Sequence, residues 1–215
     1  MSLNLDQILK IIQSIFYITA ALIAVLTYLK AKNGLLNTIN TEYHKRVIER
    51  LSAVSEELFA EFDSGSESHW LHNNSAKELV ERIHENIGPR EEVIGSDPGG
   101  PIPFTKEEER LHRQVERYQS DPFLPRVVRE RVVDFLGARL QCVAEVHREV
   151  VENYIAGLCS GKYWDSKNEN HNWVNNEIVS RLYERGCGVS QNEEEVHAIR
   201  MEIQKYFEKF NPLGN

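Results

Sequence analysis

The sequence lacks the motifs by which most enzymes and metalloproteins are recognised. It contains no H-E-x-x-H, no G-x-S-x-G, no P-loop and no dinucleotide-binding glycine pattern. Its three cysteines, Cys142, Cys159 and Cys187, are odd in number and form no C-x-x-C pair. This argues against a disulfide framework or a zinc ribbon and favours reduced thiols. We therefore expect no enzymatic activity, no cofactor and no metal site.

Positive charge is also in short supply. The 25 lysine and arginine residues are outnumbered by 33 acidic ones, and the 215-residue chain carries a formal net charge of -8. Proteins bind nucleic acids mainly by neutralising their phosphates, so we expect no general nucleic-acid binding. The charge balance leaves room for a local site that takes a small anion.

Charge of either sign is absent from residues 11–29. This run is close to the roughly 20 residues that cross the hydrocarbon layer of a bilayer. A core helix of a soluble protein would carry charges on its outer face. A cleaved signal peptide would have a shorter apolar region followed by small residues. We therefore predict a retained transmembrane helix at residues 8–30, with the lipid bilayer as its partner.

The flanking charges predict the orientation of this helix. Lys10 precedes the run, and five basic residues follow it: Lys30, Lys32, Lys45, Arg46 and Arg50. Because basic flanks stay on the cytoplasmic side, we expect a single-pass protein of the cell inner membrane. Residues 1–7 would form a short extracytoplasmic N-terminus, and the C-terminal body would be cytoplasmic.

The predicted span has two different faces. At about 100° per residue, one side carries bulky aliphatic residues suited to lipid, and the other is polar, small or aromatic. The second face consists of Gln13, Tyr17, Ala20, Ala24 and Tyr28. Ala20 and Ala24 form a small-xxx-small pair that allows close helix approach, and Gln13 is costly in hydrocarbon without a partner. Two interpretations remain open: an anchor with incidental alanines, or a helix–helix or pore-lining interface.

Residues 31–63 are predicted to form a long juxtamembrane helix. Apolar residues recur there in steps of three and four, at Leu36, Ile39, Tyr43, Val47, Leu51, Val54, Leu58 and Phe62. Their mean spacing of roughly 3.7 lies near the eleven-residue period of nearly straight coiled coils. This stripe packs either on later helices of the same chain or on a second copy, and Gly34 is a possible break.

Residues 64–215 predict a cytoplasmic, all-helical domain. The most regular pattern runs over residues 126–158 and contains Gly137, where a close helix crossing would offset the cost of glycine. Capping boxes are predicted at Thr105 and at Ser190, and Asp121-Pro122 resembles a helix start. Residues 88–104 are rich in glycine and proline and predict a break. With no alternating strand pattern, the fold class is all-α.

The eight histidines do not form a metal or catalytic signature. His69 and His72 have a usable spacing, but no third ligand is evident. His147 falls among the apolar positions of the long helix, which favours a core histidine with a hydrogen-bond partner. Arg139 and His147 are too far apart in sequence for the Arg–His motif of helical ribonucleases.

One segment, residues 161–185, combines cations with aromatic residues and asparagines. Lys162, Tyr163, Trp164, Trp173, Arg181 and Arg185 have the chemistry to stack on a base and hold a phosphate. They are the candidate site for a small anionic or nucleotide ligand. The competing interpretation is a helix connection whose tryptophans fill the core.

The plan of the chain is similar to that of membrane-acting effectors of bacterial anti-phage systems, in architecture alone. This resemblance implies an antiviral-defence effector and transfers no residue roles. Our hypothesis is a non-enzymatic homo-oligomer that forms an ion channel or pore, gated by a ligand or partner on the cytoplasmic domain. The alternative is a membrane-tethered scaffold that binds a cytosolic protein.

Overall fold

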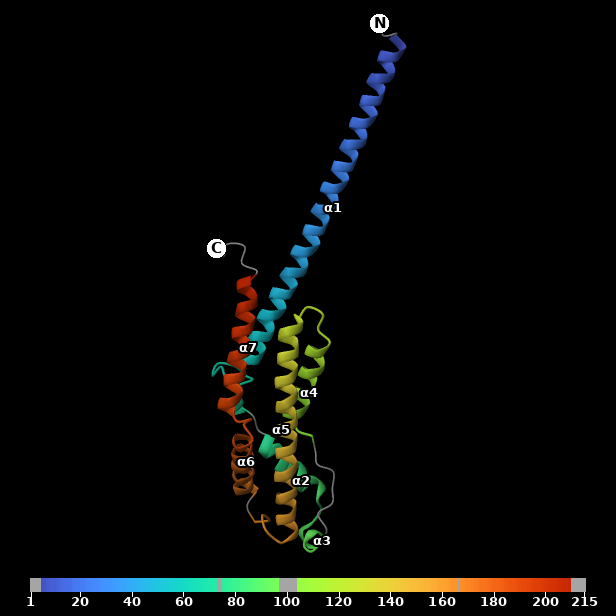
Figure 1. The fold of residues 1–215 in the computed structure, drawn as a ribbon. Coiled ribbons are helices and arrows are strands. Elements are labelled where there is room, and N and C mark those ends of the chain that lie inside the picture. Colours follow the sequence, from blue (N-terminus) through green and yellow to red (C-terminus); the bar gives the residue numbers. More distant parts are fainter. Residues whose placement is uncertain (1–4, 73–74, 97–103, 166, 210–215) are drawn as a thin grey trace. The chain divides into compact units, whose positions relative to one another are not determined.

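The computed structural model describes residues 5–72, 75–96, 104–165 and 167–209. Within these ranges the chain is all-α, as predicted, and has no strand (Figure 1). The elements are α1 (Leu5–Phe59), the short 3-10 helix η1 (Trp70–His72), α2 (Ser75–Asn86), α3 (Arg90–Val93), α4 (Lys106–Gln119), α5 (Arg126–Cys159), α6 (Lys167–Glu184) and α7 (Val189–Lys209). The predicted break at residues 88–104 and the predicted N-terminal segment lie partly outside the described residues.

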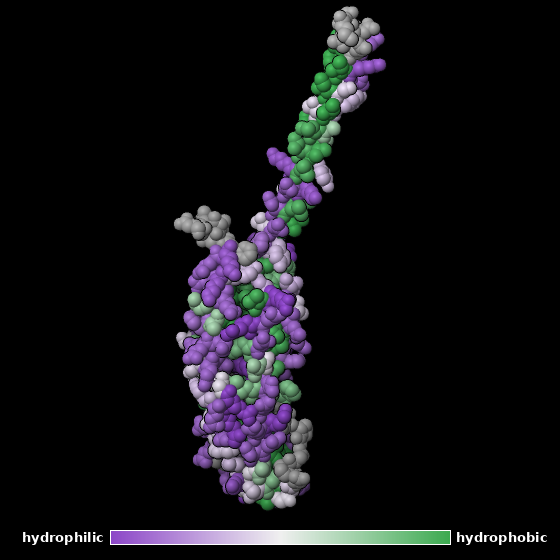
Figure 2. Space-filling view, viewed as in Figure 1, coloured by the Kyte–Doolittle hydropathy of each residue, from purple (hydrophilic) through white to green (hydrophobic). Residues whose placement is uncertain are grey.

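The chain divides into two compact units, Met1–Ile48 and Glu49–Asn215, with the boundary inside α1. The first unit carries the predicted membrane segment. Every residue from 8 to 43 is exposed, and hydrophobic side chains follow this part of α1 in Figure 2. Among the described residues, α1 is the one helix long and apolar enough to cross a membrane. Gly34 does not interrupt it, since the Thr38 hydroxyl donates to the Gly34 carbonyl at 3.0 Å inside a continuous helix.

The second unit is organised around α5, which contacts α3, α4, α6 and α7. One end of its core joins the last turns of α1 to α4, α5 and α7, through Leu51, Val54, Leu111, Leu136, Val143, Ile199 and Ile203. The other end joins α2, α3, α5 and α6 around Leu79, Val80, Val150, Tyr154, Leu158 and Val174. Part of the predicted apolar stripe, Leu51, Val54 and Leu58, is therefore buried within this unit.

Some predicted helix starts agree with the structure and others do not. Thr105 and Glu108 form the predicted capping box at the start of α4. The long helix begins at Arg126, after Pro125, and not at Asp121-Pro122. Asp121 instead accepts a hydrogen bond from the Phe123 amide at 2.9 Å and pairs with Arg50. Ser190 lies inside α7, which begins one residue earlier, so the predicted cap there was wrong.

The close approach predicted at Gly137 occurs instead at Gly157. Apart from the neighbouring residues and backbone of its own helix, no described atom lies within 4 Å of the place where a Cβ would stand at Gly137. At Gly157 the same position is 2.2 Å from Cε2 of the Tyr163 ring. Tyr163 has φ 65°, a conformation that is unfavourable for a residue with a side chain. Contacts of its ring and of its carbonyl must therefore hold it in place.

We predict opposite effects for alanine at the two glycines. Gly137→Ala should stabilise the protein by about 0.5–1 kcal/mol, because it removes a flexible residue from an open helix position. Gly157→Ala should destabilise it by about 1–3 kcal/mol, because the Tyr163 ring must move. Denaturant unfolding of the full chain in detergent measures both effects. Equal effects of the two changes would contradict the packing described for Gly157.

Candidate functional site

The aromatic residues of the segment 161–185 are brought together, as part of the core. The rings of Tyr163 and Trp173 stack with centroids 5.0 Å apart, and Tyr163 stacks on the fully buried Tyr154 at 5.2 Å. The Trp164 indole N–H donates to the Leu158 carbonyl at 2.9 Å. The Asn170 amide donates to the Tyr163 carbonyl at 2.5 Å, which stabilises the strained backbone there. These aromatic faces contact one another and the core.

The cations of the same segment face glutamates. Arg181 pairs with Glu149 at 2.8 Å and with Glu177 at 2.7 Å. Arg185 pairs with Glu145 at 2.8 Å and also with Glu149. Hydrogen bonds from both arginines hold the pKa of Glu149 below its ordinary value. An anion at the arginines would have to compete with these carboxylates.

Lys162, the remaining predicted cation, is exposed. Its backbone N–H donates to the Gly157 carbonyl at 2.8 Å, so the lysine is tied to the end of α5 through its main chain. The structure thus gathers the candidate residues into an aromatic stack and a separate ion-pair network.

The predicted interface residues of the membrane segment, Gln13, Tyr17, Ala20, Ala24 and Tyr28, are all exposed on α1. The Gln13 amide donates to the Tyr17 hydroxyl at 3.2 Å, which lowers the cost of placing Gln13 in lipid. A side-chain amide has two donor hydrogens and two acceptor lone pairs. One bond therefore leaves capacity for a neighbouring helix.

A buried charge cluster, centred on Arg139 of α5, was not predicted. The Arg139 guanidinium binds both carboxylate oxygens of Glu61, with Nη1 to Oε2 at 2.7 Å, and its Nη2 lies 3.3 Å from Glu107 Oε1. Arg110 also approaches Glu61, at 3.4 Å. Arg139 and Glu61 are 7% and 9% exposed. The cluster joins the chain after α1 to α4 and α5.

The electrostatics of the cluster follow from burial and pairing. Burial by itself raises the pKa of Glu61, but hydrogen bonds and charges from Arg139 and Arg110 outweigh it and hold that pKa below 4.5. Burial lowers the pKa of Arg139, whereas Glu61 and Glu107 raise it, and the net effect is an increase. Glu61 and Arg139 are therefore both charged at neutral pH.

His147 lies about two helical turns further along α5 than Arg139 and is 1% exposed, which confirms the predicted burial of this histidine. Neither of its ring nitrogens makes a hydrogen bond to a described residue, so the predicted hydrogen-bond partner is not found. Its Nδ1 is 3.5 Å from Oε1 of Glu108, the capping residue of α4. Burial raises the pKa of Glu108, whereas His147 and the Thr105 backbone lower it, with a net decrease.

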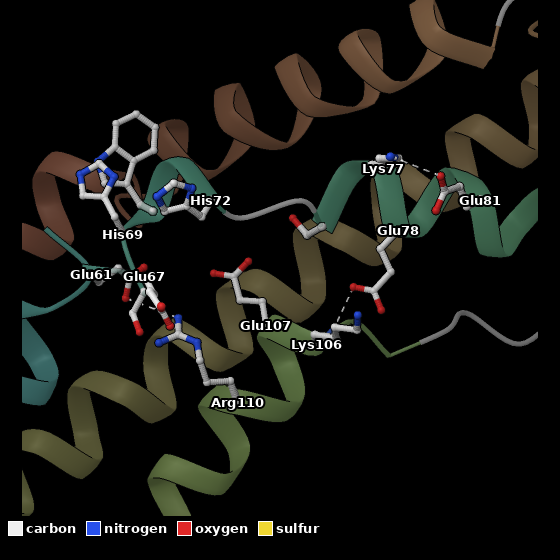
Figure 3. A pocket seen from close by; sticks show the side chains of 13 residues that line it. Glu61, Glu67, His69, His72, Lys77, Glu78, Glu81, Lys106, Glu107 and Arg110 are labelled. Carbon is white, nitrogen blue, oxygen red and sulfur yellow. Dashed lines mark hydrogen bonds and ion pairs between the residues drawn. The ribbon is translucent and has the colours of Figure 1, made fainter. Parts of the chain in front are cut away.

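Two cavities flank the charge cluster and share Glu61, Trp70, Ser75 and Glu107. The one in Figure 3 has a volume of about 590 Å³, and Arg110 points across it toward Glu61 and Glu67. Its charged lining consists of Glu61, Glu67, Glu78, Glu81 and Glu107 against Lys77, Lys106 and Arg110. This excess of carboxylates favours a cationic over an anionic ligand.

The second cavity, of about 290 Å³, reaches Arg139 and Val143 on α5 and the turn between α6 and α7. In the described ranges, no group of three or more histidine, cysteine, aspartate or glutamate side chains is arranged to hold a metal ion. His69 and His72 come together, with ring centroids 6.2 Å apart, but they lack a third ligand of that kind.

No protein-family model and no solved structure matches the chain. A segment of 101 residues is 29% identical to Protein ITPRID2 of Pongo abelii. The match covers 47% of this chain and 12% of that protein, so the chain corresponds to a small part of the relative's length. This similarity is too partial to carry a function.

We predict that Arg139→Met destabilises the protein by about 3–5 kcal/mol, because it leaves the carboxylates of Glu61 and Glu107 buried without their cation. The matched control is Arg131→Met on the same helix. Arg131 pairs with Glu195 at an exposed site, 2.8 Å away, where such pairs contribute about 0–1 kcal/mol. Denaturant unfolding followed by tryptophan fluorescence measures both, and similar losses would contradict a special role for the buried pair.

We also predict a loss of stability in acid that depends on Glu61. Because its folded-state pKa is lowered, Glu61 contributes stability that is fully present above about pH 4.5 and disappears as the pH falls through the lowered value. Glu61→Gln should therefore be less stable at pH 7 and show a flatter decline below pH 4.5. Unfolding free energies from pH 7 to pH 3 give the comparison, with the exposed Glu195→Gln expected to follow the wild type.

Proposed function

We propose that the protein is a non-enzymatic, single-pass protein of the cell inner membrane that assembles into a homo-oligomer and forms a ligand- or partner-gated pore. The observation that carries the proposal is the membrane segment of α1. It is an exposed helix, without charge over residues 11–29, that has one aliphatic face and one polar, small and aromatic face. In this proposal the N-terminus lies outside and the helical unit lies in the cytoplasm. The architectural resemblance to anti-phage effectors supports an effector role.

The chemistry of the second face supports self-association. Ala20 and Ala24 allow two backbones to approach closely, and van der Waals packing of this kind drives helix association in lipid. Gln13 provides amide groups that bind across a helix interface or contact water in a pore. Its bond to Tyr17 at 3.2 Å keeps the two polar groups together on that face.

The stripe beyond the membrane supports the same assembly. Leu36, Ile39 and Tyr43 of this stripe are exposed in the first unit. A 30 Å hydrocarbon layer takes up about 20 helical residues, which residues 8–30 supply, so these side chains would lie outside the lipid tails. A second copy of α1 would remove them from water. A ligand or partner on the helical unit would then change the packing of the assembled helices.

We predict ion flux through liposomes that contain the full-length protein, and its loss in Gln13→Leu and in Ala20→Leu/Ala24→Leu. The first change removes the polar group of the interface, and the second fills the space that close approach requires. The matched control is Leu22→Ile/Leu26→Ile on the aliphatic face, which should conduct like the wild type. A dye-release or ion-flux assay measures the effect, and cross-linking in the same vesicles reports the oligomer.

Replacement of residues 8–30 by an unrelated hydrophobic helix separates the pore from the alternative scaffold. A pore should lose both its flux and its cross-linked oligomer after this exchange. A scaffold should retain its cytosolic partner and show no flux in either form. Wild-type protein that is monomeric and non-conducting in vesicles would overturn the proposal.

A further inference from the structure

The 290 Å³ cavity of the helical unit has an apolar wall and one polar end. The apolar wall is formed by Phe62, Val143, Ile178, Val179, Leu182 and Val189. The polar end consists of Glu61, Glu107 and Arg139. Glu61 and Glu107 also line the larger cavity shown in Figure 3. An apolar space with a few convergent polar groups is the usual form of a small-molecule site.

The size of this cavity suits one small organic molecule. An engineered cavity of roughly 150 Å³ in another protein holds one benzene molecule, and this cavity, at about 290 Å³, is larger. A benzene ring that carries a short alkyl chain therefore fits. Trp70 and Tyr183 also line the cavity and are 40% and 43% exposed. They mark the side from which a molecule in solution would enter.

The guanidinium of Arg139 has one donor that the rest of the cluster does not use. Its Nη1 and Nη2 both bind Glu61, and Nη2 also lies 3.3 Å from Glu107 Oε1. Within the described residues no acceptor takes a hydrogen bond from Nε, although the side chain is 7% exposed. A buried donor without an acceptor is costly. A bound molecule that places an oxygen at Nε would remove this cost.

The geometry of the guanidinium selects the kind of oxygen. Nε–H and one Nη2–H of an arginine point in the same direction. Because Nη1 and Nη2 share Glu61, the Nη2 hydrogen that remains for Glu107 is the one beside Nε–H. An oxygen at Nε therefore lies next to the Glu107 carboxylate. A hydroxyl meets both groups, since it accepts one hydrogen bond and donates another. An anionic oxygen would be repelled by Glu107, and an ammonium group has no lone pair for Nε.

We propose that this cavity binds a neutral alcohol or phenol whose apolar body has about ten non-hydrogen atoms. The hydroxyl accepts a hydrogen bond from Arg139 Nε and donates one to Glu107. The apolar body packs on Val143, Ile178 and Leu182. The inference concerns the helical unit and holds whether or not α1 forms a pore.

The test uses 4-propylphenol, which is neutral at pH 7 because the pKa of a phenol is about 10. Full-length protein is dialysed to equilibrium against the phenol, with the same detergent on both sides of the membrane. We expect saturable binding of one molecule per chain with a Kd of roughly 0.1–1 mM. The methyl ether 4-propylanisole cannot donate a hydrogen bond and should bind at least about tenfold more weakly. The anion 4-propylbenzoate should not bind.

Val179→Trp locates the bound phenol. Val179 lines the cavity and is 43% exposed, so the larger side chain can fill the space from its open side without entering the core. This variant should lose saturable binding. The matched control is Val127→Trp, at a 71% exposed valine of α5 that does not line this cavity. The control should bind the phenol like the wild type and take up the same amount of detergent.

Three results would each overturn the proposal. Equal affinity for the phenol and its ether would show that no hydroxyl is recognised and that the Arg139 donor is satisfied in another way. Tighter binding of the benzoate would assign the cavity to anions. Uptake that does not saturate, or that is the same in wild type and Val179→Trp, would place the phenol in the detergent or elsewhere on the protein.

Discussion

The arrangement of the helical unit depends on the ion pair between Arg139 and Glu61. Glu61 stands two residues after the end of α1, and its carbonyl accepts the Trp70 amide at 2.9 Å. Arg139 therefore fixes both the end of α1 and the start of η1, while Glu107 connects the same guanidinium to α4. A buried arginine that lacks this geometry would be costly. An all-apolar core could pack here in several arrangements. The buried guanidinium allows only arrangements in which it stays paired with carboxylates.

One long helix, α5, contributes buried side chains to both apolar regions of the unit. Arg139 lies on α5 beside Leu136 and Val143, which belong to the apolar set shared with α1, α4 and α7, whereas the set shared with α2, α3 and α6 begins further along α5, at Val146. His147 and Glu108 add a second polar connection between α5 and α4 at 3.5 Å. Of these polar groups, His147 lies where the two sets meet along α5, beside Val146. Each set keeps a dense aliphatic interior, and the orientation of the helices is specified by directional bonds.

Helix positions were predictable because local rules determine them. The apolar period placed the long helix at residues 126–158, and α5 covers Arg126–Cys159. The capping box at Thr105 needs a bond between residues only three apart. The ion pair of Arg139 was not predictable in this way, since Glu61 is 78 residues distant in sequence. One signal was available: Arg139 is a charged residue directly beside the apolar stripe of its helix.

The candidate ligand segment shows the same limit. Composition revealed aromatic rings and cations in residues 161–185, but composition does not show what they contact. Tyr154, the ring beneath the stack, and Glu149, the partner of both arginines, belong to α5. The close approach at Gly157 likewise depends on where the Tyr163 ring returns to α5. Each of these features can be recognised only in the folded structure and not from the sequence pattern.

Different physical effects govern the apolar side chains of the two units. In the helical unit, side chains such as Leu51, Val54 and Leu58 leave water within one chain, so burial there needs no partner. In the proposed membrane location, residues 8–30 of the first unit would gain nothing from the hydrophobic effect when two copies meet in lipid, and their association would depend on close packing and polar contacts. The stripe at Leu36, Ile39 and Tyr43 would face water, where apolar burial itself favours a second helix. A homo-oligomer of α1 would therefore be held by packing inside the bilayer and by hydrophobic burial outside it.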